Sequence, residues 1–262
     1  MWAAVMALPK VAIDTEILWN TPVGSDVYEL TVQGGGIVTQ AQPGQFIHLQ
    51  IPSGDVFLRR PFGIADTDEN EGQLTMYYRV MGKGTRVLTA LKRGDVVNCL
   101  GPLGHGFSLN AKRPLLVGGG MGLAPLLYLA KRFRGKADVL MGGRNRDELF
   151  WEKIFAPYVR KTFVATDDGS LGTKGFTTEL LPKVLGNEAY DCVYTCGPEI
   201  MMRGIANIAA QKGVACQVSL EKRMACGLGA CLSCVCDTAN EERKKICKDG
   251  PVFWAQDVFF AQ

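Results

Sequence analysis

The sequence predicts a multi-domain β plus α/β protein, with an N-terminal antiparallel β-barrel, a doubly wound parallel-sheet domain and a small C-terminal loop domain. Three observations lead to this prediction. Short alternating strands separated by turn signals fill the first part of the chain, strands alternate with helices in the middle, and cysteines crowd the end. We expect the domains to be residues 1–110, 111–220 and 221–262.

The bulk composition is that of an ordinary globular protein. Of the 262 residues, 47% are hydrophobic and 21% are charged, and the net charge is +3. The chain has no block of like charge, so neither nucleic acid nor an anionic membrane is an expected partner. No apolar run approaches the roughly 18 residues that suggest a membrane span.

The N-terminus and the cysteine content bear on location. The first ten residues, "MWAAVMALPK", lack the charged and extended apolar regions of a signal peptide, and we interpret them as a leader or an early start before the first strand. The nine cysteines are an odd number, and several lie close together. This arrangement suits metal ligation in a reducing compartment, so we expect a cytoplasmic protein.

Strand signals dominate residues 10–108. Runs of alternating apolar and polar residues are separated by the turn signals "QGGG", "QPGQ", "PSGD" and "KRGD". Several short strands at this spacing are typical of a small barrel or sandwich. The expected strands are 11–20, 26–32, 46–51, 74–80 and 95–101.

The pattern changes at Lys112. "RPLLVGGGMGLAPLLYLAKRF" predicts an apolar strand, a glycine turn and a helix with Leu123, Leu127 and Ala130 on one face. Further strands alternating with helices follow, which predicts a parallel, doubly wound sheet. Pro198 is expected in the first turn of the last of these helices. From residue 221 onward the chain is expected to be loop-like.

Four cysteines near the C-terminus have the spacing of a plant-type [2Fe–2S] site. Four thiolates must converge on two irons, and a tight loop relieved by Gly227 and Gly229 can wrap such a cluster. The expected ligands, in the pattern C-x4-C-x2-C-x12-C, are Cys226, Cys231, Cys234 and Cys247.

The remaining cysteines and a zinc site are the alternatives to weigh. Structural zinc prefers paired C-x2-C knuckles, and this segment contains one such pair. Unligated buried thiols fit the isolated Cys99, Cys192 and Cys216 better than the cluster. Cys236 lies two residues after Cys234 and would share its face on an extended strand, but the pattern leaves Cys236 out of the ligand set.

Two stretches of the predicted barrel suit a flavin dinucleotide. "FLRRPFGI", at 57–64, can place an arginine on a pyrophosphate with an aromatic or apolar side chain beside the flavin ring. "GKGT", at 82–85, offers unhindered backbone N–H groups and a hydroxyl to a phosphate. Taken alone, each stretch is more often an ordinary surface turn.

Two turns of the predicted parallel sheet suit a nucleotide. "VGGGMGLAP", at 117–125, follows a strand and opens a helix, as a dinucleotide site requires, although it is not the dehydrogenase pattern G-x-G-x-x-G. "YTCGP", at 194–198, also ends a strand before a helix, which places Cys196 at the carboxyl edge of the sheet, where ligands bind. A glycine-rich packing turn and an inert core cysteine are the alternatives.

The order of these motifs resembles that of the ferredoxin–NADP reductase superfamily over nearly the whole chain. With "ATDDGSLGTKGF" and the cysteine segment added, the sequence is similar to the electron-transfer subunits of class 1B dihydroorotate dehydrogenases. In that family a barrel binds FAD, a second domain binds NAD and a C-terminal segment carries one [2Fe–2S] cluster. The resemblance implies FAD contacts at Arg60, Pro61, Phe62, Gly63, Tyr77, Tyr78, Arg79, Gly84 and Thr85.

The nucleotide motifs and the resemblance together place the NAD site. Cys196 is a candidate neighbour of the nicotinamide. Gly63 is expected on the N5 side of the flavin, where the superfamily usually has Ser or Thr, so a backbone N–H is expected to replace the hydroxyl contact. The expected NAD contacts are Gly118, Gly119, Gly120, Gly122, Asp168, Cys196, Gly197 and Pro198.

The residues after the strand "TFVAT" favour NAD over NADP. Reductases of this superfamily that prefer NADP commonly have Ser and Arg there, which hold the 2′-phosphate. This chain has Asp167 and Asp168, and a carboxylate repels that phosphate but can accept hydrogen bonds from a ribose hydroxyl. The same "DDG" is also a common surface turn, and Arg144 or Arg146 could still reach the phosphate.

The resemblance implies a relay of electrons. A hydride passes between nicotinamide C4 and flavin N5, and the flavin exchanges single electrons with the cluster. Electrons are expected to enter from an FMN-containing partner that oxidises dihydroorotate in pyrimidine biosynthesis, within a heterotetramer of two copies of each chain. Phe253 and Trp254 are expected to pack either against that partner or within this chain.

Two rival functions remain at this point. The small flavin and iron–sulfur subunit of an electron-bifurcating ferredoxin:NADP oxidoreductase, or a γ-type subunit of a hydrogenase or sulfide dehydrogenase, has a similar order of motifs. A zinc-stapled nucleotide-binding regulator without redox turnover is the alternative outside enzymes. Colourless protein that contains zinc and no flavin would identify that regulator.

Overall fold

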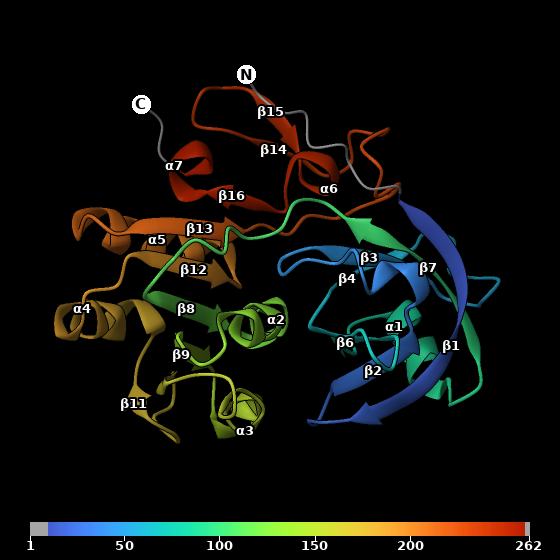
Figure 1. Cartoon of the computed structure of the whole chain (residues 1–262), viewed down its shortest axis with the longest axis horizontal. Coiled ribbons are helices and arrows are strands. Elements are labelled where there is room, and N and C mark those ends of the chain that lie inside the picture. Colours follow the sequence, from blue (N-terminus) through green and yellow to red (C-terminus); the bar gives the residue numbers. More distant parts are fainter. Residues whose placement is uncertain (1–9, 260–262) are drawn as a thin grey trace.

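In the computed structural model, which describes residues 10–259, two seven-stranded sheets stand side by side and a two-stranded hairpin lies above them (Figure 1). The first sheet contains the N-terminal strands and the second the central strands, and the hairpin belongs to the C-terminal segment. The predicted fold class is confirmed. Residues 1–9, which hold most of the expected leader, lie outside the described residues, as do residues 260–262.

The N-terminal sheet is an antiparallel half-barrel with the strand order β4-β3-β7-β1-β2-β6-β5. All five predicted strands are present. Strands β4 and β5 and helix α1 go beyond the prediction, because "RPFG" and "DTD" lack alternating apolar residues and α1 begins in a glycine-rich turn. The elements are β1 (Val11–Pro22), β2 (Val27–Gln33), η1 (Gly35–Ile37), β3 (Phe46–Gln50), β4 (Arg60–Gly63), β5 (Asp66–Asp68), β6 (Gln73–Arg79), α1 (Lys83–Ala90) and β7 (Val96–Leu103).

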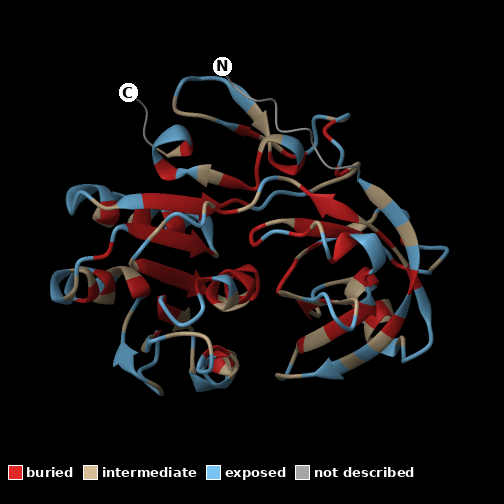
Figure 2. Cartoon of the chain, viewed as in Figure 1, coloured by how far each residue is buried: buried red, intermediate tan, exposed pale blue. Residues whose placement is uncertain are grey.

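The half-barrel has a core of its own. Side chains on its concave face are completely buried and form one cluster, which includes Ile17, Leu30, Ile47, Leu49 and Met76. Alternation of apolar and polar residues along the strands produces this face, and its buried segments stand out in Figure 2. Burial of one such side chain stabilises a fold by about 1.5–3 kcal/mol.

The second sheet is doubly wound, with the strand order β11-β10-β9-β8-β12-β13-β16. From β8 the chain moves outward in one direction, then returns to continue from β12 in the other, and the strands from β8 to β13 are parallel. The elements are β8 (Pro114–Gly119), η2 (Gly120–Gly122), α2 (Leu123–Phe133), β9 (Asp138–Gly143), η3 (Arg146–Leu149), α3 (Trp151–Phe155), β10 (Lys161–Thr166), β11 (Thr173–Lys174), α4 (Thr177–Asn187), β12 (Cys192–Cys196), α5 (Glu199–Gln211) and β13 (Ala215–Ser219).

The helices cover both faces of this parallel sheet. Helices α2 and α3 lie on the face toward the half-barrel, and α4 and α5 lie on the opposite face (Figure 1). Pro198 is the N-cap residue immediately before α5, so its expected place inside the first turn was wrong by one position.

The C-terminal segment is more ordered than the loop that the sequence predicted. It contains β14 (Val235–Asp237), β15 (Arg243–Lys245), α6 (Ile246–Asp249), β16 (Val252–Trp254) and α7 (Ala255–Val258). Strand β16 pairs antiparallel with β13 and so joins the parallel sheet as its edge. Phe253 packs against the core of that sheet, whereas Trp254 is 40% exposed. The strand was missed because three residues leave too short a pattern to detect.

Helix α2 joins the two sheets. Every residue from Leu123 to Ala130 is buried, as expected for a helix enclosed on all sides. Its Tyr128 hydroxyl donates to the carbonyl of Ala41 at 3.0 Å and accepts from Thr67 at 2.9 Å. Lys131 forms an ion pair with Asp66 on β5. These contacts fix the half-barrel against the parallel sheet.

A buried carboxylate organises the opposite, amino-terminal edge of the parallel sheet. Asp138, at the start of β9, is fully buried. It accepts hydrogen bonds from Arg160 at 2.6 Å and from the Tyr190 hydroxyl at 2.6 Å, and Arg113 lies 3.7 Å away. Because the carboxylate is desolvated, its partners must remain in place for the strand ends to be stable.

We expect Asp138→Asn to lower the free energy of unfolding by about 2 kcal/mol, because the buried amide has one acceptor oxygen and turns its N–H2 toward a donor of Arg160 or Tyr190, while Glu188 still pairs with Arg113 and Arg160. Urea unfolding of the purified protein, followed by circular dichroism, measures this loss. The control is Arg243→Ala, which breaks the exposed pair with Asp237 and is expected to change stability by less than about 1 kcal/mol. Equal effects of the two variants would contradict the prediction.

Candidate functional site

A cleft of 1150 Å³ opens at the carboxyl edge of the parallel sheet. It lies at the point where the strand order reverses between β8 and β12, which is where open α/β sheets bind ligands. The N-terminal ends of α4 and α5 face it, and the half-barrel contributes Arg79 and Met81 to its wall. The cleft therefore has the position and the size of a nucleotide site.

Two glycine turns meet at the floor of this cleft. A Cβ atom on Gly122 would lie 2.2 Å from the carbonyl oxygen of Cys196, and one on Gly197 would lie 3.1 Å from the backbone of Gly119. Any side chain at these positions would force the two turns apart. The glycines therefore let the ends of β8 and β12 pack closely while their backbone stays open to a ligand.

The predicted glycines divide into two groups. Gly119, Gly120 and Gly122 line the cleft, as do Gly197 and Pro198. Gly118 lies below the surface, where a Cβ would come within 2.6 Å of the Leu123 side chain.

The structure does not bring the Cys196 thiol to the cleft. Cys196 is 1% exposed, and its side chain belongs to the cluster packed between the sheet and α2. Burial raises the pKa of this thiol well above its usual range. The strand alternation turns the Cys196 side chain inward, and Gly197 and Pro198 after it line the cleft.

The acidic turn after β10 contributes through Asp167 rather than Asp168. Asp167 lines the cleft. The Asp168 carboxylate accepts a hydrogen bond from the Ser170 N–H at 2.8 Å, and the Ser170 hydroxyl and then this N–H hold its pKa below the usual range. Asp168 is thus the turn-forming residue of "DDG", and Asp167 is the carboxylate of this turn that lines the cleft.

The two nearby arginines are both engaged by this chain. Arg144 lines the cleft, but its guanidinium binds the Glu148 carboxylate at 2.8 and 2.5 Å. Arg146 donates to the carbonyl of Ser170 at 3.0 Å. The contact with Arg144 holds the pKa of Glu148 below its usual range, so the pair is ionised and internally neutral.

The flavin motif of the barrel is assembled from β4 and the start of α1. The Arg60 side chain lies against Gly84, where a Cβ would be 3.2 Å from its Nε atom. The first N–H groups of α1 are at the same place, and a helix N-terminus attracts anions. The Thr85 hydroxyl accepts from the N–H groups of Met81 and Gly82 at 2.9 and 3.1 Å, so it caps the start of the helix.

Three aromatic side chains of the predicted flavin set are buried in the protein. Phe62 and Tyr78 belong to the half-barrel core, and their rings lie 5.8 Å apart. Tyr77 points to the other side, against Trp151, and its hydroxyl donates to Glu29 at 2.6 Å. Little of these residues is exposed: 9% of Phe62, 6% of Tyr77 and 2% of Tyr78.

The other residues of the flavin set stay near open space or near the second sheet. Pro61 is exposed. Arg79 lines the cleft, where Asp26 and Glu148 hold its guanidinium at 3.2 and 3.3 Å. Gly63 lies where β4 meets α2, and a Cβ there would be 3.4 Å from Pro125, an ordinary contact distance. A serine at this position would therefore fit.

The cysteine loop, residues 226–234, and Cys247 on α6 bring four thiols together as two pairs. The sulfurs of Cys226 and Cys231 are 3.3 Å apart, close to the roughly 3.8 Å between two sulfurs on one tetrahedral metal. Cys234 lies near enough to Cys247 to raise the pKa of that thiol to about 12, after the larger effect of burial. Two thiolates for each iron is the donor set that a two-iron cluster takes, so the residues fit it. Among residues 10–259, no three or more His, Cys, Asp or Glu side chains meet at a point suited to one metal ion.

Backbone N–H groups point at these sulfurs. Leu228 and Cys231 donate to the Cys226 sulfur at 3.4 and 3.5 Å, and Gly229 donates to Cys247 at 3.2 Å. Burial would raise the pKa of Cys226, but these N–H groups outweigh it and lower the pKa to about 6. Donors aimed at sulfur stabilise the thiolates that iron requires.

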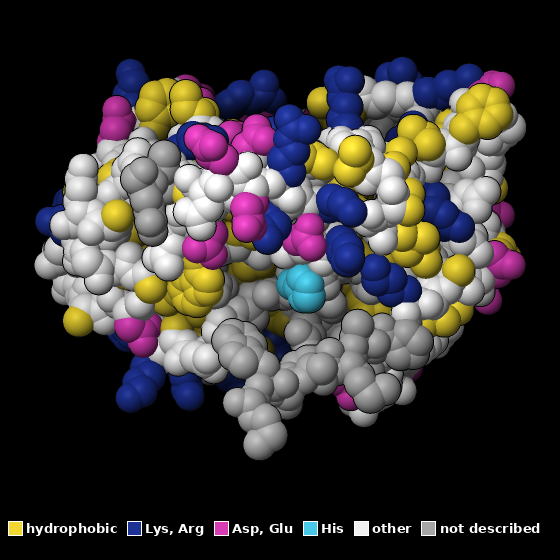
Figure 3. Space-filling model, turned by 90° about the horizontal axis from the view of Figure 1, so that it is seen from above, with side chains coloured by type: hydrophobic (Ala, Val, Ile, Leu, Met, Phe, Trp, Pro, Cys, Tyr) yellow, Lys and Arg dark blue, Asp and Glu magenta, His cyan; other side chains and the backbone are white. Residues whose placement is uncertain are grey.

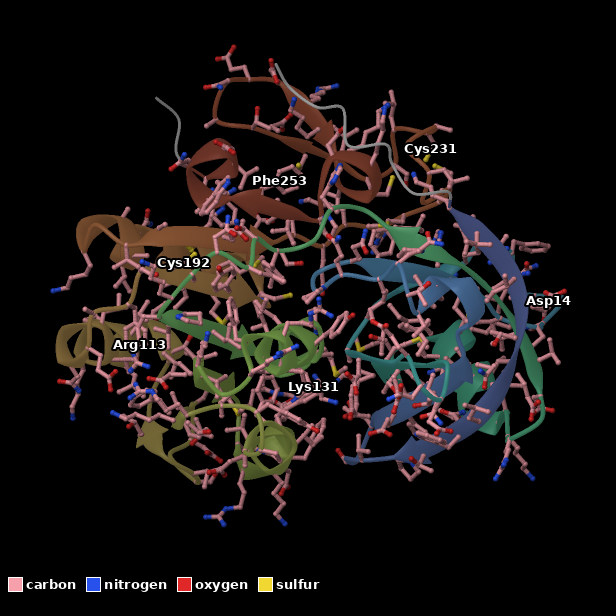
Figure 4. The ribbon with its side chains drawn as sticks, viewed as in Figure 1. Asp14, Arg113, Lys131, Cys192, Cys231 and Phe253 are labelled. Atoms are coloured by element: carbon pink, nitrogen blue, oxygen red, sulfur yellow. The ribbon has the colours of Figure 1, made fainter. Side chains whose placement is uncertain are left out.

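The other cysteines lie apart from this loop. Figure 4 places Cys231 in the C-terminal segment on the side of the half-barrel, and Cys192 within the parallel sheet. Cys99, Cys192 and Cys216 are buried, as expected for packing thiols. Cys236 is buried too, and it lines the nucleotide cleft.

Two further residues at the site were not predicted. Glu221 follows β13 and lines the cleft; solvent still reaches its side chain, but the surrounding atoms withdraw enough water to raise its pKa. Its place after a parallel strand was the available signal. His48, on β3, is buried beside Gly227 of the cysteine loop. A single histidine within a strand gives no sequence signal that it packs against such a loop.

Two segments of the chain match known protein families. Residues 16–107 match the oxidoreductase FAD-binding domain family, and residues 221–259 match the iron–sulfur cluster binding domain of dihydroorotate dehydrogenase B. The dihydroorotate dehydrogenase B (NAD(+)) electron transfer subunit of Caldanaerobacter subterraneus is 40% identical over 248 residues, which are 93% of this chain and 97% of the relative. The chain belongs to this family of electron transfer subunits.

Other relatives and solved structures agree with this family. The electron transfer subunit of Bacillus caldolyticus is 43% identical over 246 residues, 90% of this chain and 94% of its own. A solved NADH-dependent reduced ferredoxin-NADP oxidoreductase, studied for electron bifurcation, is 31% identical with a TM-score of 0.81, covering 93% of this chain and 89% of that one. A ferredoxin reductase of carbazole 1,9a-dioxygenase, at 20% identity and a TM-score of 0.67, covers 79% of this chain and 68% of its own and shares the fold.

Membership sets the cofactors and the type of enzyme. As a dihydroorotate dehydrogenase B electron transfer subunit, the chain is part of an oxidoreductase with an FAD-binding and an iron–sulfur domain, and the name implies a separate catalytic subunit. None of the helices between residues 10 and 259 has the length and apolar character needed to cross a membrane.

We expect Cys226→Ser to abolish the visible absorbance of the iron–sulfur cluster, because one thiolate of a close pair is lost, while Cys236→Ser leaves it unchanged. Absorption spectra and iron and sulfide content of the two purified variants measure this. FAD content is the control for folding of the half-barrel. A full cluster in Cys226→Ser would contradict Cys226 as a ligand. Loss of the cluster in Cys236→Ser would make Cys236 a ligand.

Proposed function

We propose that this chain passes electrons between a partner that oxidises dihydroorotate to orotate and NAD, as part of pyrimidine biosynthesis. The observation that carries the proposal is the presence of three sites in one chain of this family. These sites are strand β4 with its Arg-Pro-Phe motif, the nucleotide cleft and the cysteine loop with its two thiol pairs, and they lie on neighbouring elements. The partner is proposed to contain FMN and to form a heterotetramer with two copies of each chain.

The residues of this chain hold and separate the cofactors. When bound, FAD supplies the exchange of a hydride with nicotinamide and of single electrons with a [2Fe–2S] cluster. Arg60 and the N-terminus of α1 are proposed to bind the flavin pyrophosphate, through charge and free N–H groups. The cluster ligands are proposed to be Cys226, Cys231, Cys234 and Cys247.

The nucleotide is proposed to be NAD, held over the glycine turns of β8 and β12. Asp167 at the cleft repels a 2′-phosphate. Arg144, one of the cations that line the cleft, is neutralised by Glu148. A 2′-phosphate would therefore meet a negative group and no free arginine among these residues.

The partner is proposed to dock around the cysteine loop. Leu228 and Leu232, on either side of Cys231, are 44% and 73% exposed. Figure 3 looks onto this side of the molecule and shows Lys and Arg side chains gathered beside hydrophobic ones. Exposed Arg223 and Lys248 belong to the same segment. An apolar centre with a basic rim suits a protein surface of complementary charge.

The remaining proposals concern organisation and location. We propose functional units at residues 1–110, 111–220 and 221–262, supported by the family matches to the first and last of them. A cytoplasmic location is proposed because a cluster held by free thiolates suits a reducing compartment.

Co-expression with an FMN-containing catalytic subunit is expected to give a complex that reduces NAD⁺ when dihydroorotate is added. Absorbance of NADH at 340 nm measures this activity. This chain alone, loaded with FAD and iron, is the control and is expected to be inactive with dihydroorotate. Failure of the loaded complex, together with activity toward a ferredoxin, would assign the chain to the bifurcating enzymes; a colourless zinc protein would make it a regulator.

We expect Asp167→Ser to raise the kcat/KM for NADPH relative to NADH by about tenfold or more, because a like charge next to the 2′-phosphate costs several kcal/mol. Reduction of the bound flavin by each nucleotide, measured by stopped flow, gives this ratio. Asp168→Ser is the matched control, since its carboxylate serves the turn, and its ratio is expected to stay the same. A change in the control alone would return the role to Asp168.

A further inference from the structure

His48 is a buried polar side chain whose ring makes no hydrogen bond within residues 10–259. It lies on β3 and is 0% exposed, and neither of its ring nitrogens has a hydrogen-bond partner among residues 10–259. Leaving a buried donor or acceptor without a partner costs about 1–3 kcal/mol. We therefore expect a bound cofactor or a neighbouring segment to supply the missing hydrogen bond.

The ring faces the cysteine loop. Its neighbours Ile47 and Leu49 belong to the core of the half-barrel, so the alternation of the strand directs His48 to the outer face. There it packs on Gly227, where a Cβ would lie 2.5 Å from Nδ1. Gly227 also has a φ of +69°, so both its conformation and the imidazole require glycine.

The same strand carries this ring beside the flavin motif. His48 is paired across the sheet with Pro61 on β4, one residue after Arg60. The His48 carbonyl accepts from Arg59 at 3.1 Å, which ties the strand to the start of that motif. His48 thus lies between the Arg-Pro-Phe strand and the loop that begins at Cys226.

The imidazole carries at least one N–H donor in either of its charge states. The carbonyl of Cys226 lies near the ring, without the geometry of a hydrogen bond.

We propose that His48 is a positioning residue for the iron–sulfur cluster: its N–H is directed to the Cys226 side of the cluster and seats the cysteine loop on the strand next to the flavin motif. This rests on the proposed role of Cys226 as a ligand. Hydrogen bonds around cluster sulfurs set the reduction potential, because a donor stabilises the more negative, reduced cluster. The half-barrel thereby influences the redox property of a cluster that it does not ligate.

The test replaces the imidazole with and without a donor. His48→Phe fills the space but removes the N–H, His48→Asn keeps an amide near Nδ1, and His48→Gln keeps one near Nε2. The FAD- and iron-loaded protein is titrated with a chemical reductant, and the cluster potential and the electron paramagnetic resonance spectrum of the reduced cluster are recorded. These readings do not use dihydroorotate, so they stand whether or not the proposed substrate is correct.

His48→Phe is expected to retain FAD and iron, but its cluster is at least tenfold harder to reduce, which is about 59 mV for one electron, and its spectrum changes. One of the two amide variants recovers most of the wild-type potential and identifies the nitrogen that donates. If His48→Phe does not retain the cluster, the cluster potentials of His48→Asn and His48→Gln are compared with each other. Unequal potentials support the proposal, and equal potentials overturn it.

The control weakens the same strand from its other face. Leu49→Val removes one buried methylene group in the half-barrel core and is expected to lower thermal stability while leaving the potential and spectrum unchanged. A wild-type potential and spectrum in a fully loaded His48→Phe protein overturns the proposal. An equal shift in Leu49→Val also overturns it, because the effect would then come from loosening of the strand.

Discussion

The enclosure of helix α2 is the packing on which the nucleotide cleft and the flavin motif both depend. The helix lies between the parallel sheet and the half-barrel, with eight successive buried residues from Leu123 to Ala130. The turn η2 that leads into it lines the nucleotide cleft, and Pro125 in its first turn lies opposite Gly63 of β4, where an added Cβ would be 3.4 Å away. A shift of α2 would therefore move the nucleotide site and the flavin strand relative to each other. Its ties through Tyr128 and Lys131 to the half-barrel resist such a shift.

The proposed sites are ordered along paired strands. Strand β4 carries the flavin motif, β3 pairs with it, and the outer face of β3 supports the cysteine loop. Each step is a backbone pairing or a contact of buried atoms, not a flexible linker. Electron transfer between cofactors depends on their separation, so a rigid order of this kind suits a chain whose task is to hold two redox groups at a fixed spacing.

Patterns in the sequence were sufficient for the turns and the thiol spacing. The glycines after β8 and β12 must be glycine because another backbone is in contact, and the cysteine spacing follows from the donor set of a cluster. Side-chain directions could not be predicted equally well. Tyr77 and Tyr78 are adjacent, so one faces Trp151 and the other the half-barrel core, and the choice depends on strands far away in sequence. The same limit explains Cys196, which turns inward, and Asp168, whose carboxylate is used by its own turn.

The pairing of β16 with β13 makes the cysteine segment an excursion that leaves the parallel sheet and returns to it. The N–H of Leu220 donates to the carbonyl of Pro251 at 2.9 Å, so the two ends of the excursion are held together. Loop closure depends weakly on length, about 0.6 kcal/mol for each doubling. Lengthening at the hairpin tip between β14 and β15 is thus inexpensive in stability, whereas loss of the last strand frees one end of the segment. Strand β16 thereby holds the two ends of the cysteine-rich segment together.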